Sequence, residues 1–369
     1  MSLSEPGGSG GAEARRNLAQ WLHRMARPPQ ETTFDGRRPG AGREAAKAVR
    51  WLRGRAAPAG RAWRLARFEA RVARATRSGR PIAVVIGNCQ APPVHDLLAD
   101  SPAFAGEYEL VPVPPIHAIT AAEVRTLRRL LARTELIVGQ PISADYRGLG
   151  LGLEQLVAHA PPGCRTIRWA SMYWSALFPY CVYVHTAPRM YVGAPIVEYH
   201  DVRFLACAAA GMDTVASRAL LREHTVPPGG LAAVEEDMLA RYGGADRLCD
   251  ISMLDWIRRP ENEAAAFWTI NHPTRITLEE LARRVHEQLG LPFASTDGPE
   301  PLGALIAPID AATLAGRPGE PRHDWVLNGR VIPQDKLLDI HLAWYRKRPD
   351  VVAAGVVEHA ARRAQLGLP

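Results

Sequence analysis

A cysteine flanked by two amide side chains follows the first strongly apolar segment in the main part of the chain. Cys89 lies between Asn88 and Gln90, directly after Gly87 and the run 82–86. A cysteine thiolate is a strong nucleophile, and side-chain amides can donate hydrogen bonds to the oxyanion of an acyl-transfer reaction. These residue types in one turn predict acyl-transfer or related nucleophilic chemistry. A buried structural cysteine is the alternative interpretation.

The segments on either side place this turn at a ligand-binding edge. The run 82–86 contains only Ile, Ala and Val, as expected for a strand buried on both faces. Residues 91–98 carry two prolines at their start and are predicted to begin a helix. In an open parallel sheet such a turn lies at the carboxyl edge, where ligands bind. The helix N-terminus there would favour the thiolate form of Cys89.

Strands and helices alternate through the following 80 or so residues. Strands are predicted over 108–113, where Pro112 indicates an edge strand, over 135–139 and over 165–169, and helices over 121–133 and 149–159. This alternation predicts an α/β fold with a mostly parallel sheet flanked by helices, a flavodoxin-like or SGNH-like core, followed by a helix-rich region over 201–258. Right-handed crossovers place Gln140, after the strand 135–139, at the same edge as Cys89.

A histidine far along the chain is the second candidate for chemistry. His272 follows the apolar run 267–270, and Pro273 stiffens its turn. Thr277 and Glu280 have the spacing of an N-cap with a capping box, which predicts a helix over 278–289. A histidine before a helix in a sheet fold is a candidate general base, whereas a lone histidine is more often a satisfied polar residue.

The segment 172–191 is rich in aromatic residues and is interrupted by proline. Tyr173 and Trp174 begin it, and we expect them to contact a cofactor in a pocket for an acyl, nucleotide or sugar group. The alternative is that the aromatic rings form a satellite core.

Composition limits the class of protein. The chain has 369 residues, of which 47% are hydrophobic and 22% charged, as in ordinary globular proteins. No apolar run approaches the roughly 20 residues of a membrane span, and the first residues lack the apolar region of a secretory signal. The five cysteines are scattered, without a CxxC motif. We therefore expect a cytoplasmic protein with neither a disulfide framework nor a metal site.

Charge divides the chain unevenly. Residues 1–80 contain 18 Lys and Arg against 6 Asp and Glu, and the remainder contains 27 against 32. We interpret 1–80 as a basic, partly disordered arm with an amphipathic helix, 81–290 as the α/β catalytic domain, and 291–369 as a partly helical extension without chemistry of its own. The helix is expected to dock on the acidic main body; contact with a membrane surface or an acidic partner is the alternative. No motif for nucleic acid accompanies it.

Three motifs resemble those of the WcbI family. This family is named for a capsular polysaccharide biosynthesis protein, and its members are regarded as acetyltransferases that bind coenzyme A. The motifs are Gly87-Asn88-Cys89-Gln90, Gln140-Pro141-Ile142 and Asn271-His272-Pro273. The resemblance covers roughly 81–290 and implies coenzyme A-dependent acyl transfer, with acetyl-CoA as co-substrate and a carbohydrate hydroxyl as acceptor.

The resemblance also implies roles for individual residues. Cys89, His272 and Gln90 would be catalytic. Apart from the resemblance, the chemistry and position of the residues lead us to expect oxyanion or substrate contacts from Asn88, Gln140 and Asn271, and coenzyme A contacts from Gly87, Tyr173 and Trp174.

Two mechanisms fit these residues. Either the Cys89 thiolate forms an acyl-enzyme, with its pKa lowered by the helix and His272, or His272 deprotonates the acceptor for direct attack and Cys89 only shapes the site. We expect replacement of Cys89 by Ala to abolish transfer while leaving coenzyme A binding nearly intact, and a variant with the parent rate would exclude covalent catalysis. An SGNH-like esterase and a non-catalytic carbohydrate- or nucleotide-binding protein are the alternative functions.

Overall fold

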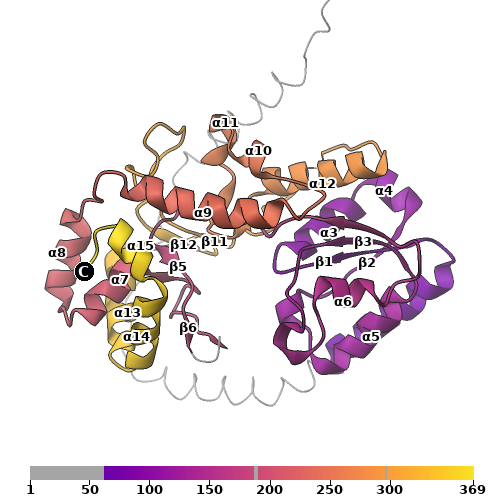
Figure 1. Cartoon of the computed structure of the whole chain (residues 1–369), viewed down its shortest axis with the longest axis horizontal. Helices are drawn as coiled ribbons and strands as arrows, with labels where there is room; N and C mark the ends of the chain where they lie inside the picture. Colours follow the sequence, from indigo (N-terminus) through magenta and orange to yellow (C-terminus); the bar gives the residue numbers. More distant parts are fainter. Residues whose placement is uncertain (1–61, 187–189, 296) are drawn as a thin grey trace, which may run out of the picture. The chain divides into compact units, whose positions relative to one another are not determined.

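The computed structural model describes residues 62–186, 190–295 and 297–369, all within the compact unit Pro58–Pro369. Most of the predicted basic arm, residues 1–61, lies outside the described residues. A helix over 62–78 comes first (Figure 1). The sheet region then contains β1 (Ile82–Ile86), α3 (Ala91–Ala99), α4 (Pro102–Glu107), β2 (Glu109–Val111), α5 (Ala121–Leu131), β3 (Thr134–Gly139), α6 (Leu153–Val157) and β4 (Arg165–Arg168), with 3-10 turns at Ile116–Ala118 and Tyr146–Gly148.

The four strands of this region form one parallel sheet in the order β2-β1-β3-β4. β2 lies at the edge, as Pro112 predicted. Because β1 and β3 are parallel neighbours, their carboxyl ends lie side by side, with Ile86 paired to Gly139. The predicted parallel sheet flanked by helices is confirmed, whereas its flavodoxin-like or SGNH-like character stays a prediction.

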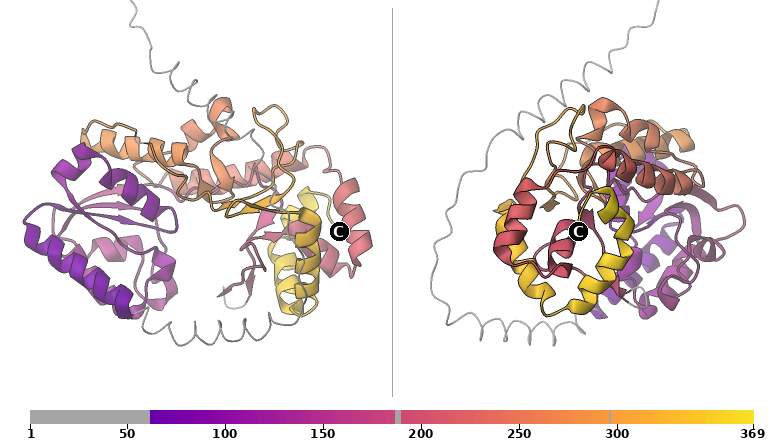
Figure 2. Two further views of the ribbon diagram at one scale, coloured as in Figure 1. Left: turned by 180° about the vertical axis from the view of Figure 1, so that it is seen from behind. Right: turned by 60° about the vertical axis from the view of Figure 1, so that its left-hand side comes forward.

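β1 is buried on both faces because helices cover each side of the sheet (Figure 1, Figure 2). Ala83 and Val85 belong to one apolar core, together with residues of α3 and of α12 (Arg275–Leu289). Ile82, Val84 and Ile86 belong to a second core, with residues of α5 and α6. Two apolar environments on opposite faces explain the unbroken apolar run that predicted this strand.

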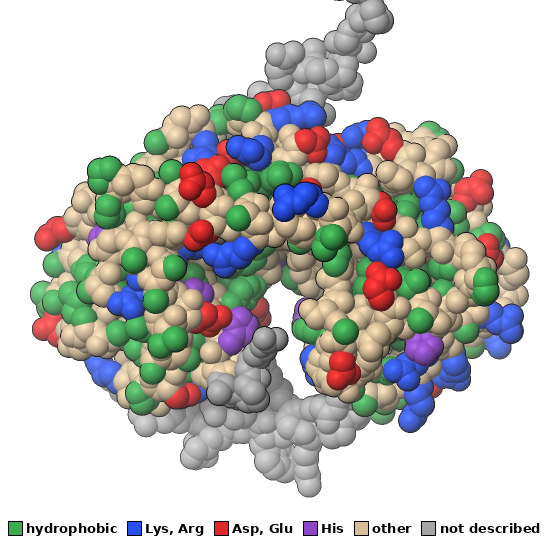
Figure 3. All heavy atoms as spheres, viewed as in Figure 1, with side chains coloured by type: hydrophobic (Ala, Val, Ile, Leu, Met, Phe, Trp, Pro, Cys, Tyr) green, Lys and Arg blue, Asp and Glu red, His purple; other side chains and the backbone are tan. Residues whose placement is uncertain are grey.

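The helix over 62–78 docks on the sheet region, as expected for its apolar side. Phe68 and Val72 are buried in the same core as α5, and Arg64 Nε donates to Glu123 Oε1 at 2.9 Å. The compact unit therefore begins upstream of the predicted boundary at residue 81. Figure 3 shows Lys and Arg side chains gathered at the surface over α5.

A second region follows the sheet and is mainly helical. It contains β5 (Cys181–Val182), β6 (His185–Thr186), β7 (Met190–Tyr191), β8 (His200–Asp201), α7 (Val202–Ala209), α8 (Thr214–Glu223), α9 (Gly230–Asp246), α10 (Leu254–Ile257), α11 (Pro260–Glu263), β9 (Phe267–Thr269), β10 (His272–Pro273) and α12. The helices predicted over 201–258 are confirmed as α7, α8, α9 and the shorter α10.

The predicted start of α12 is wrong. α12 begins at Arg275, its N-cap is Thr274, and the Thr274 side chain accepts no capping hydrogen bond. Thr277 lies inside the first turn, where its hydroxyl donates to the carbonyl of Ala266 at 2.8 Å. The Thr277 hydroxyl is therefore bonded to the segment that precedes the helix and does not act as the N-cap that the capping box required.

The last part of the chain packs back onto the second region. It contains β11 (Leu305–Ile306), β12 (Trp325–Leu327), β13 (Arg330–Ile332), α13 (Gln334–Tyr345), α14 (Pro349–Glu358) and α15 (Ala360–Gln365). α14 lies close to α7 because Gly355 has no side chain, and a Cβ there would be 3.0 Å from Leu205 Cδ1. None of the helices in the described part combines the length and apolar character that a membrane crossing demands.

Candidate active site

The turn after β1 is shaped by a side chain from the turn after β3. Gln140 Oε1 accepts a hydrogen bond from the backbone N–H of Asn88 at 2.8 Å. This approach requires glycine at position 87, since a Cβ there would lie 2.5 Å from the same oxygen. A larger residue at position 87 would therefore clash with the Gln140 side chain. The structure brings the first two predicted motifs together at the carboxyl edge of the sheet.

Gln90 is fully buried and joins three segments. Its Nε2 donates to the carbonyl oxygens of Met172 and Asn271, at 2.7 and 2.8 Å. Its Oε1 accepts from Met172 N at 3.1 Å and from Gln140 Nε2 at 3.0 Å. Every one of these partners is a protein group. The catalytic role expected for Gln90 therefore gives way to a positioning one, because no atom of its amide is left for a substrate.

A relay of side chains connects the third motif to the cysteine. The hydroxyl of Tyr199 donates to Asn271 Oδ1 at 2.5 Å, and Asn271 Nδ2 lies 3.9 Å from Cys89 Sγ. Accepting from Tyr199 fixes which way the Asn271 amide points, so its N–H₂ faces the sulfur. Cys89 and Asn271 are therefore neighbours in space although 182 residues separate them.

Burial controls the protonation of the cysteine. Cys89 is half-buried, and burial raises the pKa of its thiol to about 11, against a lowering by its own backbone N–H and a further raising by Glu198. The prediction that the helix N-terminus favours a thiolate is therefore wrong for this state of the protein, because desolvation outweighs the backbone donor. Near neutral pH the side chain is a thiol.

His272 lies on the short strand β10, where it pairs with Thr269 of β9. Its ring packs edge-on against Tyr199, with 6.2 Å between ring centroids. Burial lowers the pKa of His272 to about 4, so the imidazole is neutral near pH 7. Its Nδ1 is buried and meets no hydrogen-bond partner among the described residues. Such an orphaned nitrogen is rare in a native interior and suits a group that receives a partner from a substrate.

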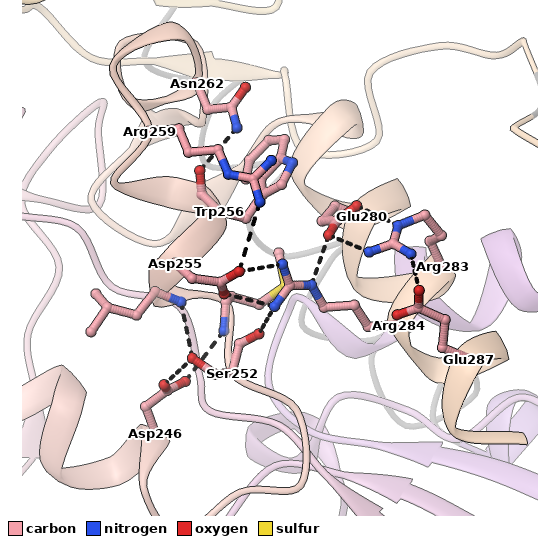
Figure 4. A network of polar contacts seen from close by, with 12 residues as sticks. Asp246, Ser252, Asp255, Trp256, Arg259, Asn262, Glu280, Arg283, Arg284 and Glu287 are labelled. Carbon is pink, nitrogen blue, oxygen red and sulfur yellow. Dashed lines mark hydrogen bonds and ion pairs between the residues drawn. The ribbon is translucent and has the colours of Figure 1, made fainter. Parts of the chain in front are cut away.

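An ion-pair network holds the helix that follows His272 (Figure 4). Arg284 of α12 forms a two-pronged pair with Asp255, at 2.7 and 2.8 Å, and donates to the carbonyl of Ser252 at 2.6 Å. The same guanidinium reaches Glu280 Oε1 at 2.7 Å. Two-pronged arginine–carboxylate pairs add geometric specificity to their energy. The network therefore fixes α12, and with it β10, relative to the segment 252–255.

The two aromatic residues predicted to bind a cofactor have different surroundings. Trp174 is fully buried, stacks on Phe267 and donates its indole N–H to Glu263, so it belongs to the core and presents no surface to a cofactor. Tyr173 lines a cavity of about 330 Å³. Ser171 lines the same cavity and accepts a hydrogen bond from Asn88 Nδ2 at 2.7 Å. One residue of the cavity wall is thus hydrogen-bonded to the cysteine turn.

Comparisons with known proteins agree with the motifs. Residues 82–294, more than half of the chain, match the model of the family described as polysaccharide biosynthesis enzyme WcbI. The chain belongs to this family. None of the curated proteins matches it.

A solved structure of WcbI has the same fold as this WcbI-family chain. The two share 22% sequence identity with a TM-score of 0.66, and the match covers 78% of this chain and 98% of that chain. That protein is described as a novel polysaccharide biosynthesis enzyme, in native form without a disulfide bond between coenzyme A and one of its cysteines.

The sequence did not single out two residues of the WcbI-family site. Ser171 comes just after β4, and a serine at the carboxyl end of a parallel strand is a signal that could have found it. Tyr199 lies within a segment without strand or helix periodicity, and nothing local marks its contact with Asn271.

Proposed function

We propose that this protein is an O-acyltransferase that moves an acyl group from a coenzyme A thioester, such as acetyl-CoA, to a hydroxyl of a carbohydrate or glycoconjugate. The observation that carries the proposal is the meeting of the Cys89 turn with the Asn271-His272 motif at the edge of the sheet. Family membership and the mention of coenzyme A beside a cysteine in the solved WcbI support it. The cavity lined by Ser171 and Tyr173 offers space for a ligand, and Ser171 is joined to the Cys89 turn by its hydrogen bond from Asn88.

The protonation states favour direct transfer over an acyl-enzyme. With a pKa of about 11, roughly one Cys89 thiol in ten thousand is ionised at pH 7. His272 is neutral, and its Nδ1 has no hydrogen-bond partner among the described residues, so we assign it as the group that takes the proton of an acceptor hydroxyl. The acceptor oxygen then forms a bond to the thioester carbonyl carbon, the C–S bond breaks, and the proton passes to the leaving thiolate of coenzyme A.

The oxyanion of this reaction needs donors that the protein does not already use. Both N–H groups of the Gln90 amide donate to protein carbonyls, whereas the amides of Asn88 and Gln140 each donate one hydrogen bond among the described residues and keep a second N–H. Asn271 Nδ2 has only its long contact to Cys89 Sγ, and the backbone N–H of Cys89 meets only its own sulfur within the described part of the chain. We assign the Asn271 amide and the Cys89 backbone N–H as the oxyanion donors, and the second N–H of Asn88 and of Gln140 keeps these two residues as further candidates.

Replacing Cys89 by Ala separates the two mechanisms. In direct transfer, we expect kcat to fall by no more than about tenfold, the effect of a contact worth about 1.4 kcal/mol. The rate should be flat between pH 6 and 9, because His272 is already deprotonated well above its pKa of about 4. A covalent mechanism predicts a dead variant and, in the parent, a rate that rises with pH toward the thiol pKa of about 11. Steady-state rates across pH decide between them.

Release of free thiol from acetyl-CoA tests the function itself. We expect release only when a carbohydrate acceptor is present, and mass spectrometry should find the acetylated acceptor. Cleavage of a simple ester without coenzyme A would instead identify an esterase. Binding of a carbohydrate with neither reaction would leave a binding protein and remove the transferase proposal.

A further inference from the structure

The cavity lined by Ser171 and Tyr173 also contains two arginines, which come from two different helices. Arg241 lies on α9, and Arg362 lies on α15 in the part of the chain for which the sequence predicted no chemistry. Tyr173 and Ser175 line the same cavity. With about 330 Å³ of space, the cavity falls within the range of small-molecule sites.

Both arginines of this lining keep hydrogen-bonding capacity, and the buried hydroxyl of Tyr242 also has no partner among the described residues. Arg362 donates to the carbonyl of Pro179 at 3.0 Å and to Ser175 Oγ at 3.3 Å, while its buried Nε has no partner in the described part of the molecule. Among the residues that the structure describes, Arg241 has only a 4.0 Å pair with Asp237 and a hydrogen bond to the carbonyl of that residue. Both guanidinium groups thus keep donors for a ligand.

The two carboxylates of the lining already have partners. Asp237 Oδ2 accepts from Gln365 Nε2 at 2.7 Å. Glu358 accepts from the backbone N–H and the ring Nδ1 of His185, at 2.8 and 2.7 Å. Both carboxylates are therefore already engaged by donors of the protein. Planar, forked donors from two arginines match the oxygens of a phosphate group.

We propose that this cavity binds a phosphate group, held by Arg241 and Arg362, on a ligand whose reactive end lies at Cys89. The placement relies on the hydrogen bond between Asn88 and Ser171, which joins the cavity wall to the cysteine turn. The inference rests on the proposed function for the reactive end only. Two sources of the phosphate fit, namely coenzyme A itself and a phosphorylated sugar acceptor.

Isothermal titration of the full chain with coenzyme A, pantetheine, inorganic pyrophosphate and a hexose 1-phosphate tests the proposal. We expect the double variant Arg241→Gln/Arg362→Gln to lose at least tenfold in affinity for pyrophosphate. If the source is coenzyme A, its affinity falls equally while that of pantetheine, which lacks phosphate, is unchanged. If the source is the acceptor, only the hexose 1-phosphate follows pyrophosphate.

Two further variants keep the test decisive. Arg241→Gln alone alters an exposed side chain and should fold normally, with a smaller loss of affinity in the same direction. Arg247→Gln removes a positive charge just after α9, outside the cavity lining, and should bind all four probes like the parent. Equal binding of every probe by parent and double variant, or no binding of any phosphate compound by the parent, overturns the proposal. Phosphate binding without acyl transfer would instead refute the proposed reaction and leave the cavity proposal standing.

Discussion

Replacing His272 by Ala is expected to lower kcat for acyl transfer about 10²–10⁴-fold, the usual contribution of a positioned general base. The reason is that the neutral imidazole, with a buried Nδ1 that has no partner in the described part of the chain, is the group able to take the acceptor's proton. KM for acetyl-CoA should change little, because the base acts in the transition state rather than in donor binding. Stopped assays of free thiol with a saturating acceptor measure both quantities.

A structural role for His272 would give a different result. His323→Ala, at an exposed position, is the matched control and should retain the parent rate. Added imidazole should restore part of the activity of His272→Ala, since a small base can enter the space that the side chain vacates. A variant that is folded by circular dichroism, inactive and insensitive to imidazole would argue that His272 only supports the packing around Tyr199. A fully active variant would remove the base assignment.

The elements that the sequence predicted well are those with a strong local pattern. The apolar run of β1 needs two covered faces, and the parallel sheet supplies them. The positions of Cys89 and Gln140 at one sheet edge follow from the same topology, because parallel strands end on the same side. The approximate bounds of α7, α8 and α9 follow from helical periodicity.

What the sequence could not supply depends on partners far along the chain. The pKa of Cys89 is set by burial and by Glu198, which no local pattern places near it. Tyr199 orients Asn271 across 72 residues. Thr277 has the ideal spacing for a cap, but the carbonyl of Ala266 competes for its hydroxyl. Arg362 has the sequence character of a solvated helix face, yet its Nε is buried in the cavity wall.

Replacing Gln90 by Leu is expected to have the largest effect on stability, about 3–5 kcal/mol of the free energy of unfolding. The buried amide makes four hydrogen bonds, to Met172 N and O, to the carbonyl of Asn271 and to the side chain of Gln140. Leucine matches the volume but leaves each of these groups without its partner inside the protein. Urea unfolding curves, with the slope compared to confirm the same transition, give the difference.

The same variant separates positioning from direct catalysis. Gln288→Leu makes the same chemical change at an exposed position of α12 and should shift stability by less than about 0.5 kcal/mol. If Gln90 positions the site, the Gln90→Leu protein that remains folded should lose the ordered contact between the turn 87–90 and Asn271, and its activity should fall as a result. The pH profile of the remaining activity should keep the shape of the parent's profile. A variant as stable as the parent but inactive would mean that Gln90 acts on substrate directly. Because Gln90 bonds to both Met172 and Asn271, its loss should separate the cysteine turn from the segment that carries Asn271 and His272, and transfer depends on that contact.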